Sequence, residues 1–148
     1  MKKRKAFWLL LILTTFIIPQ VSSGQSDTDV LLDKCASNLG TFNYIKSFKV
    51  NVGFWKKSGP EYSYVFSKGS TYLLILCNEN TDKGKMVINL YDTNRNTVAS
   101  NYDEKTKEYF TDLLYPCSAT GVYYIKISFE GMKRGHGICI LGFNKEKQ

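Results

Sequence analysis

The sequence predicts an all-β fold, an antiparallel jelly-roll-like β-sandwich of about eight strands with one short N-terminal helix. Short β-rich runs separated by turn residues follow one another from residue 42 to residue 144, with no helical pattern between them. Tyrosine and phenylalanine contribute 10 and 9 residues, and both suit a pleated, half-buried surface. The stretch from Cys117 to Gly131 alternates cleanly, with Tyr123, Ile125 and Ile127 on one face. We therefore expect it to form a central strand.

The N-terminus has the pattern of a secretory signal peptide. Four basic residues precede an apolar run from Ala6 to Ile18, and small residues follow at Ser22, Ser23 and Gly24. We predict a signal peptide over residues 1–24, cleaved after Ser23 or Gly24. The apolar run is shorter than the roughly 20 residues that span a bilayer. The expected product is a secreted or periplasmic chain without a stable membrane span.

Removal of this leader lowers the net charge of the chain. The full sequence carries +7, but four of its 20 Lys and Arg residues lie in the leader and all 13 Asp and Glu residues lie beyond it. The mature chain has 16 basic residues against 13 acidic ones, a net charge of +3. A nucleic-acid-binding protein would show a stronger basic patch, so we expect no nucleic-acid partner.

Residues 25–148 are long enough for one domain and too short for two. From Asp27 to Leu39, apolar residues recur at helical spacing, and Gly40 is a natural stop. This segment is the predicted helix.

Eight runs are predicted as strands between residues 42 and 144. They are Phe42 to Phe54, Tyr62 to Phe66, Thr71 to Asn78, Lys85 to Asp92, Thr97 to Tyr102, Glu108 to Tyr115, Gly121 to Glu130 and His136 to Phe143. The runs from Thr71 to Cys77 and from Gly137 to Phe143 are apolar on both faces, which is typical of strands covered on both sides. The N-terminal helix is the expected cover for one outer face.

All four cysteines follow the leader, and none forms a CxxC pair. An even number in an oxidising compartment predicts two disulfides rather than a zinc or redox site. Four cysteines allow three connectivities. Placing the helix over the sheet makes Cys35 with Cys139, and Cys77 with Cys117, the preferred pairing.

Three segments together resemble the bacterial pre-peptidase C-terminal domain family, a jelly-roll-type sandwich appended to many secreted enzymes. They are Phe66 to Leu74 (FSKGSTYLL), Val87 to Ala99 (VINLYDTNRNTVA) and Thr120 to Ile127 (TGVYYIKI). The cysteines and the helix fall outside that pattern, so the chain looks closer to small cysteine-containing secreted bacterial proteins of that design. Lys85 and Val87 stand where some relatives place acidic residues for calcium. The resemblance implies an accessory binding role rather than catalysis.

The sequence contains no recognisable catalytic or cofactor motif, and we expect neither an enzyme nor a cofactor. The only histidine, His136, lies between two glycines and is expected to be an exposed turn residue. A small hydrolase using His136 would also need a free cysteine. Asp103 and Glu104 are adjacent, so on a strand they would point to opposite faces.

Strand reversal is expected to bring four charged connections to one end of the sandwich: residues 56–61, 78–84, 103–107 and 130–135. Trp55, Lys56, Lys57, Lys133 and Arg134 are the candidate binding residues there. Asp82, Asp103 and Glu104 are weaker candidates for calcium ligands, since hard cations need several convergent oxygens.

These observations predict a non-enzymatic binding or accessory module for a glycan or a protein. In the glycan case, Trp55 would supply a flat face for a sugar ring. The alternative is an assembly or envelope subunit that adds a strand at an open sheet edge.

Overall fold

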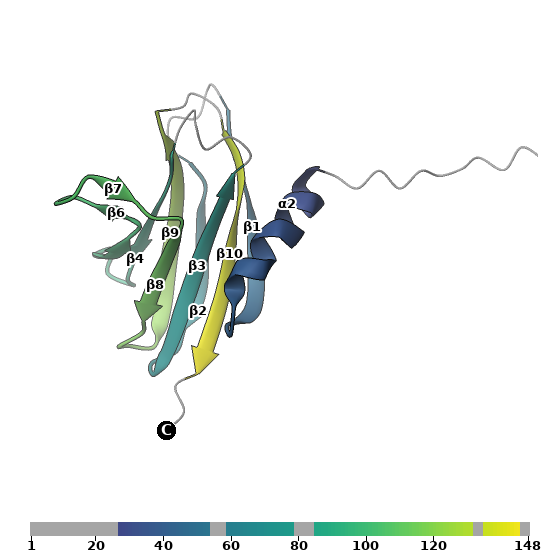
Figure 1. Ribbon diagram of the computed structural model, residues 1–148. Coiled ribbons are helices and arrows are strands. Elements are labelled where there is room, and N and C mark those ends of the chain that lie inside the picture. Colours follow the sequence, from purple (N-terminus) through teal and green to yellow (C-terminus); the bar gives the residue numbers. More distant parts are fainter. Residues whose placement is uncertain (1–26, 54–58, 79–84, 132–134, 146–148) are drawn as a thin grey trace, which may run out of the picture.

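The computed structural model describes residues 27–53, 59–78, 85–131 and 135–145. The predicted signal peptide lies outside these residues. Within them the chain forms two packed four-stranded antiparallel sheets, with a helix against the outer face of one of them (Figure 1). This confirms the predicted all-β sandwich with one short helix.

The first sheet has the order β1-β10-β3-β8, from β1 (Asn43–Val52), β10 (Gly135–Lys145), β3 (Ser70–Asn78) and β8 (Asp112–Pro116). The second sheet has the order β2-β9-β4-β5, from β2 (Glu61–Phe66), β9 (Gly121–Glu130), β4 (Lys85–Tyr91) and β5 (Thr97–Ser100). Apart from the β4–β5 hairpin, successive strands of these sheets alternate between the two sheets. This crossing pattern is that of a jelly roll.

The alternation of β9 follows the prediction. It lies between β2 and β4, and Tyr123, Ile125 and Ile127 are at most 3% exposed. These side chains meet inward-facing residues of the first sheet, including Leu74 and Leu141, which are fully buried. The core therefore fills the space between the sheets.

Strands β3 and β10 are covered on both faces, as their apolar runs predicted. Their outward residues pack under α2 (Asp27–Ala36) and the 3₁₀ turn η2 (Ser37–Leu39). This second cluster consists of Cys35, Leu39, Leu73, Ile75, Ile138 and Ile140. The helix thus gains from tertiary burial the stability that so short a helix lacks alone.

The predicted disulfide pairing is wrong. Cys35 is bonded to Cys77, with 6.2 Å between their Cα atoms, and Cys117 and Cys139 are free and buried. Strand alternation explains the difference, because Cys77 lies on the same face of β3 as Leu73 and Ile75, under the helix. Cys139 points to the opposite face of β10 and belongs to the core between the sheets.

The described residues form ten strands rather than eight, because each of two predicted runs is divided. Between β5 and β8 the chain makes a small hairpin of β6 (Tyr102–Asp103) and β7 (Glu108–Tyr109), which projects beside the sandwich (Figure 1). The division occurs at Asn101, which is 1% exposed. Its side chain accepts from Ile88 N at 2.7 Å and donates to Met86 O at 3.0 Å and Phe110 O at 2.7 Å. A side chain here takes the place of strand pairing and ties β4 to the segment that precedes β8.

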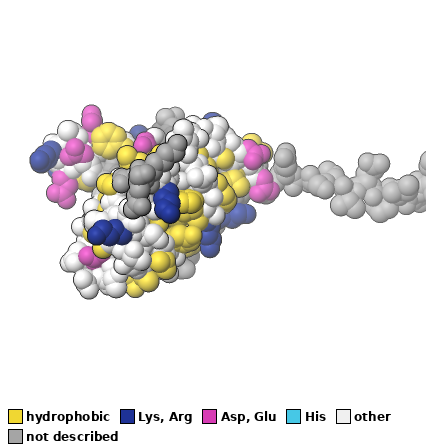
Figure 2. All heavy atoms as spheres, turned by 90° about the horizontal axis from the view of Figure 1, so that it is seen from below, with side chains coloured by type: hydrophobic (Ala, Val, Ile, Leu, Met, Phe, Trp, Pro, Cys, Tyr) yellow, Lys and Arg dark blue, Asp and Glu magenta, His cyan; other side chains and the backbone are white. Residues whose placement is uncertain are grey.

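The strand ends that flank three of the four predicted connections lie together at one end of the sandwich, while the connections themselves lie mostly outside the described residues. Val52 pairs with Gly135, Asn78 with Gly137, and Lys85 with Glu130, so the strand ends that flank these three connections lie together. The fourth connection, residues 103–107, is instead the turn of the β6–β7 hairpin (Figure 1). Seen from below, charged side chains of both signs cluster on this projection (Figure 2). No helix within the described residues is long and apolar enough to cross a membrane.

Candidate functional site

The outer face of the second sheet carries the most distinctive cluster of exposed side chains among the described residues. The helix packs on β1, β3 and β10, and this leaves the second sheet outside its cover. Residues of β9 that alternate with the core residues point outward here, among them Val122, Tyr124 and Lys126. Their neighbours across the ladder are Val65 on β2 and Tyr91 on β4.

The turn between β4 and β5 sets one arginine above this face. Asp92 organises the turn, since its carboxylate accepts from Asn94 N and Asn96 N, both at 2.8 Å, and from the Asn96 side chain at 3.0 Å. These bonds lower the pKa of Asp92 below its usual value, and the bond from the Asn96 side chain has the largest effect. Thr93 fastens the turn to β9 by donating to Val122 O at 3.1 Å.

Arg95 occupies the left-handed region of this turn, with φ of 68°. An L-residue other than glycine or asparagine rarely takes this conformation, which costs about 1–2 kcal/mol. Strained backbone of this kind is concentrated at functional sites. The surrounding Asp92 bonds hold Arg95 in place, and the conformation aims its side chain back across the sheet.

The Arg95 guanidinium lies over the Tyr124 ring and reaches β2. Its Cζ is 3.6 Å from the centre of the Tyr124 ring, and Nη1 donates to Glu61 Oε1 at 2.7 Å. The bond to Glu61 raises the pKa of Arg95, so the guanidinium stays charged. We call Glu61, Arg95 and Tyr124 the Arg95 platform.

The Arg95 platform is suited to recognition rather than to bond chemistry. The Arg95 side chain is 54% exposed. A guanidinium has five N–H donors, and the bond to Glu61 uses only one of them. The remaining donors can bind a carboxylate or carbonyl, and the adjacent Val65 and Val122 offer apolar contact. Tyr and Arg are also the residue types most enriched at the energetic centres of protein interfaces.

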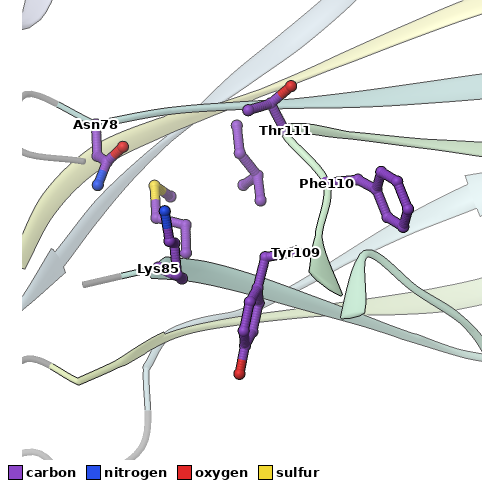
Figure 3. A pocket seen from close by; sticks show the side chains of 7 residues that line it. Asn78, Lys85, Tyr109, Phe110 and Thr111 are labelled. Atoms are coloured by element: carbon purple, nitrogen blue, oxygen red, sulfur yellow. The ribbon is translucent and has the colours of Figure 1, made fainter. Parts of the chain in front are cut away.

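A small cavity lies where the β6–β7 hairpin meets the sheets (Figure 3). Its volume is about 70 Å³, and its lining includes Leu76, Lys85, Met86 and Phe110. Ligand sites usually occupy roughly 300–1,000 Å³. This cavity has room for water but not for an organic substrate.

All five predicted binding residues lie outside the described residues. This applies to Trp55, Lys56, Lys57, Lys133 and Arg134, so the predicted rim remains a prediction.

The same holds for Asp82, one of the three calcium candidates. The Asp103 carboxylate accepts from Lys105 N at 2.7 Å, which makes it part of the hairpin turn. Among the described residues, no three His, Cys, Asp or Glu side chains gather as metal ligands.

His136 is separated from both free thiols. Cys117 bonds to Ser70 at the start of β3, whereas His136 lies beside the other end of that strand. His136 is exposed on β10 opposite Asn51, and it lies in the strand rather than in a turn as predicted. Cys139 points to the other face of β10, and its complete burial raises the pKa of its thiol. A buried, protonated thiol is a poor nucleophile. The residues that a cysteine hydrolase would need are therefore not assembled here.

The sequence reasoning missed the Arg95 platform. The Asp-Thr-Asn-Arg-Asn turn was visible, and so was the outward position of Tyr124. Which residue of the turn takes positive φ was not visible, because Asn94 and Asn96 both accept that conformation more readily than Arg95.

Comparison with solved structures shows a similarity of fold. No protein-family model and no curated protein matches the chain. Among solved structures, the fold is similar to that of Aeromonas hydrophila PliG, a periplasmic lysozyme inhibitor of g-type lysozyme, with a TM-score of 0.51 and 11% sequence identity. The match covers 69% of this chain and 88% of that one. At this identity the similarity shows the fold, and fold does not by itself imply function.

Proposed function

We propose that the protein is an exported, non-enzymatic binding module that recognises a protein partner through the Arg95 platform. One observation carries the proposal. Arg95 takes a strained backbone conformation that spreads its guanidinium over Tyr124, on a sheet face that the helix leaves uncovered. A purely structural turn would be cheaper with glycine at this position.

The disulfide bond supports an exported location for the protein. The Cys35–Cys77 disulfide is of a kind that persists in oxidising compartments such as the periplasm or the extracellular space. The predicted leader over residues 1–24 agrees with this location. The resemblance to pre-peptidase C-terminal domains remains part of the proposal, since it also implies an accessory role.

The fold similarity to PliG suggests which partner to test first. PliG is an inhibitor of g-type lysozyme, so it is a binding protein rather than an enzyme. We propose a lysozyme-type hydrolase as the partner of this chain. Glycan recognition through Trp55 is the alternative from the sequence, and it depends on a residue outside the described part of the chain.

The experiment measures binding to g-type, c-type and i-type lysozymes by surface-based interferometry, together with inhibition of cell-wall lysis. Arg95→Ala and Tyr124→Ala should each weaken binding to the preferred lysozyme by roughly 30-fold or more, the effect of losing a central contact worth about 2 kcal/mol. Asn94→Ala is the matched control, because it changes an exposed side chain of the same turn and should leave the affinity unchanged.

Two results would contradict the proposal at different levels. If none of the three lysozymes binds the wild-type protein, the lysozyme partner is wrong. If one binds equally well to Arg95→Ala and Tyr124→Ala, the Arg95 platform is not the binding surface.

A further inference from the structure

We propose that the free edge of β2 pairs with β2 of a second copy of this chain, antiparallel and around a two-fold axis at Ser63. The two second sheets would then form one continuous eight-stranded sheet. This association is carried by the backbone edge of β2 and covers Glu61, Val65 and Val122 beside Arg95 and Tyr124, but its test measures self-association and does not depend on the proposed function.

The ladder shows which backbone groups of β2 are unpaired. Ile127 N donates to Pro60 O at 3.0 Å, and β2 continues from there in register with β9. In an antiparallel ladder, hydrogen-bonded pairs alternate with non-bonded pairs. Tyr62, Tyr64 and Phe66 therefore direct their N–H and C=O groups toward β9. Glu61, Ser63 and Val65 direct theirs to the free edge.

The other three edges of the two four-stranded sheets carry features that discourage pairing, and β2 does not. Strand β1 has a register shift between Tyr44 and Lys46 and carries Lys46 and Lys49. Strand β5 has four residues and an irregular register, and the five-residue β8 ends at Pro116. Lysines, bulges, prolines and short strands are the usual protection of sheet edges. From Glu61 to Phe66, β2 has none of these devices within its length.

The free edge is self-complementary about Ser63. A two-fold axis brings identical residues together, and a small hydroxyl side chain can face its own copy and hydrogen bond to it. The same register uses all six free backbone groups and places Glu61 opposite Val65 of the second copy. Beside this edge, Ser63, Tyr64, Val65 and Val122 line a shallow hollow of about 440 Å³ that the incoming side chains can fill. Val65 is 56% exposed and would be covered by the association.

The charges near the axis permit the approach. The Glu61 carboxylate is already bound by Arg95 of its own chain, which leaves its methylene groups to contact Val65 of the second copy. On the neighbouring edge of the first sheet, Lys46 folds back with its amine 5.6 Å from the centre of the Phe48 ring. The mature chain carries a net charge of +3, so salt should screen the repulsion between two copies and strengthen the association.

The test is the mass of the purified protein by sedimentation equilibrium from micromolar to millimolar concentration, in low and high salt. Ser63→Pro removes one free N–H per chain without touching the ladder to β9, and it should weaken the dimer by roughly 30-fold or more, from two lost hydrogen bonds. Ser63→Ala keeps that N–H and is the matched control, so it should still dimerise. Circular dichroism confirms that each variant is folded.

The register has a separate test that does not depend on proline. Val65→Lys places a lysine opposite Glu61 of the second copy, and Val65→Glu places a carboxylate there. With two such pairs per dimer, the lysine variant should associate at least as tightly as wild type and the glutamate variant roughly 2- to 30-fold more weakly. A monomer at every concentration, a dimer insensitive to Ser63→Pro, or equal effects of the two Val65 variants would overturn the proposal.

Discussion

Replacing Asn101 by alanine should destabilise the fold more than any other single polar substitution among the described residues. Asn101 is 1% exposed and makes three hydrogen bonds, to Ile88 N, Met86 O and Phe110 O. Alanine would leave the Ile88 N–H buried without a partner, which costs about 1–3 kcal/mol. Loss of the two bonds to carbonyls adds about 0.5–1.5 kcal/mol each. The expected loss is roughly 2–6 kcal/mol, a large part of the 5–15 kcal/mol that stabilises a typical domain.

Urea unfolding followed by circular dichroism measures this loss. Ser100→Ala is the control, because the Ser100 hydroxyl also bonds to β4, donating to Ile88 O at 3.0 Å, but it is only partly buried. That variant should lose about 1 kcal/mol. If Asn101→Ala loses no more than Ser100→Ala, the three bonds of Asn101 do not stabilise the attachment of β4 to the segment before β8.

Asn101→Asp adds a pH dependence to the same test. The aspartate keeps the shape of asparagine but turns an oxygen toward Met86 O and Phe110 O, in a buried position. Burial and these carbonyls should raise the pKa of that carboxyl above its unfolded value of about 4. The protonated form can still donate one bond, so stability should be highest at acidic pH and fall as pH rises through the folded pKa. Wild-type protein should show no such trend from this site.

Three further predictions follow from other contacts. Replacing Cys35 and Cys77 together by serine should cost about 4 kcal/mol in urea unfolding, since their disulfide links residues 42 apart, and the wild-type protein should show two reactive thiols only after denaturation. Tyr109 donates a hydrogen bond to Glu130, and this bond raises the pKa of Tyr109 to about 12. In a spectrophotometric titration, Glu130→Gln should bring the pKa of Tyr109 back toward 10. In the wild-type protein, the stabilisation of the fold by this hydrogen bond should be present below pH 10 and lost as pH rises toward 12. Arg95→Gly should leave the free energy of unfolding within about 1 kcal/mol of wild type, because relief of backbone strain offsets the lost exposed contacts, yet it should abolish partner binding.

Strand alternation made the sandwich readable from the sequence. In β9, apolar and polar residues alternate, so the buried face could be assigned residue by residue. In β3 and β10, both faces are apolar, and this correctly predicted strands covered on both sides. The same property hid the disulfide pairing. Without contrast between the faces of Thr71 to Cys77, the pattern could not show that Cys77 faces the helix while Cys139 faces the core.

The candidate site and the side hairpin depended on contacts that no local pattern contains. Asn101 lies within a run of β-forming residues, and its three partners are 9 to 15 residues away in the chain. Arg95 is 29 residues from Tyr124 in the sequence, and its positive φ arises from the Asp92 bonds rather than from its own preference. Sequence periodicity reports which face of a strand is buried, whereas these residues act through neighbours brought together by the fold.

The two sheets divide stability and recognition between them. The outer face of the first sheet is covered by a helix that a disulfide links to β3. Its edge strand β1 has lysines and a register shift, and its other edge strand, β8, ends at a proline. The second sheet has a bare outer face, an unprotected edge at β2, and an arginine held above its centre strand. Because the helix and the disulfide act on the first sheet, substitutions on the outer face of the second should change binding or association with little effect on the free energy of unfolding. Loss of stability from Arg95, Ser63 and Val65 substitutions comparable to that from Asn101→Ala would contradict this division.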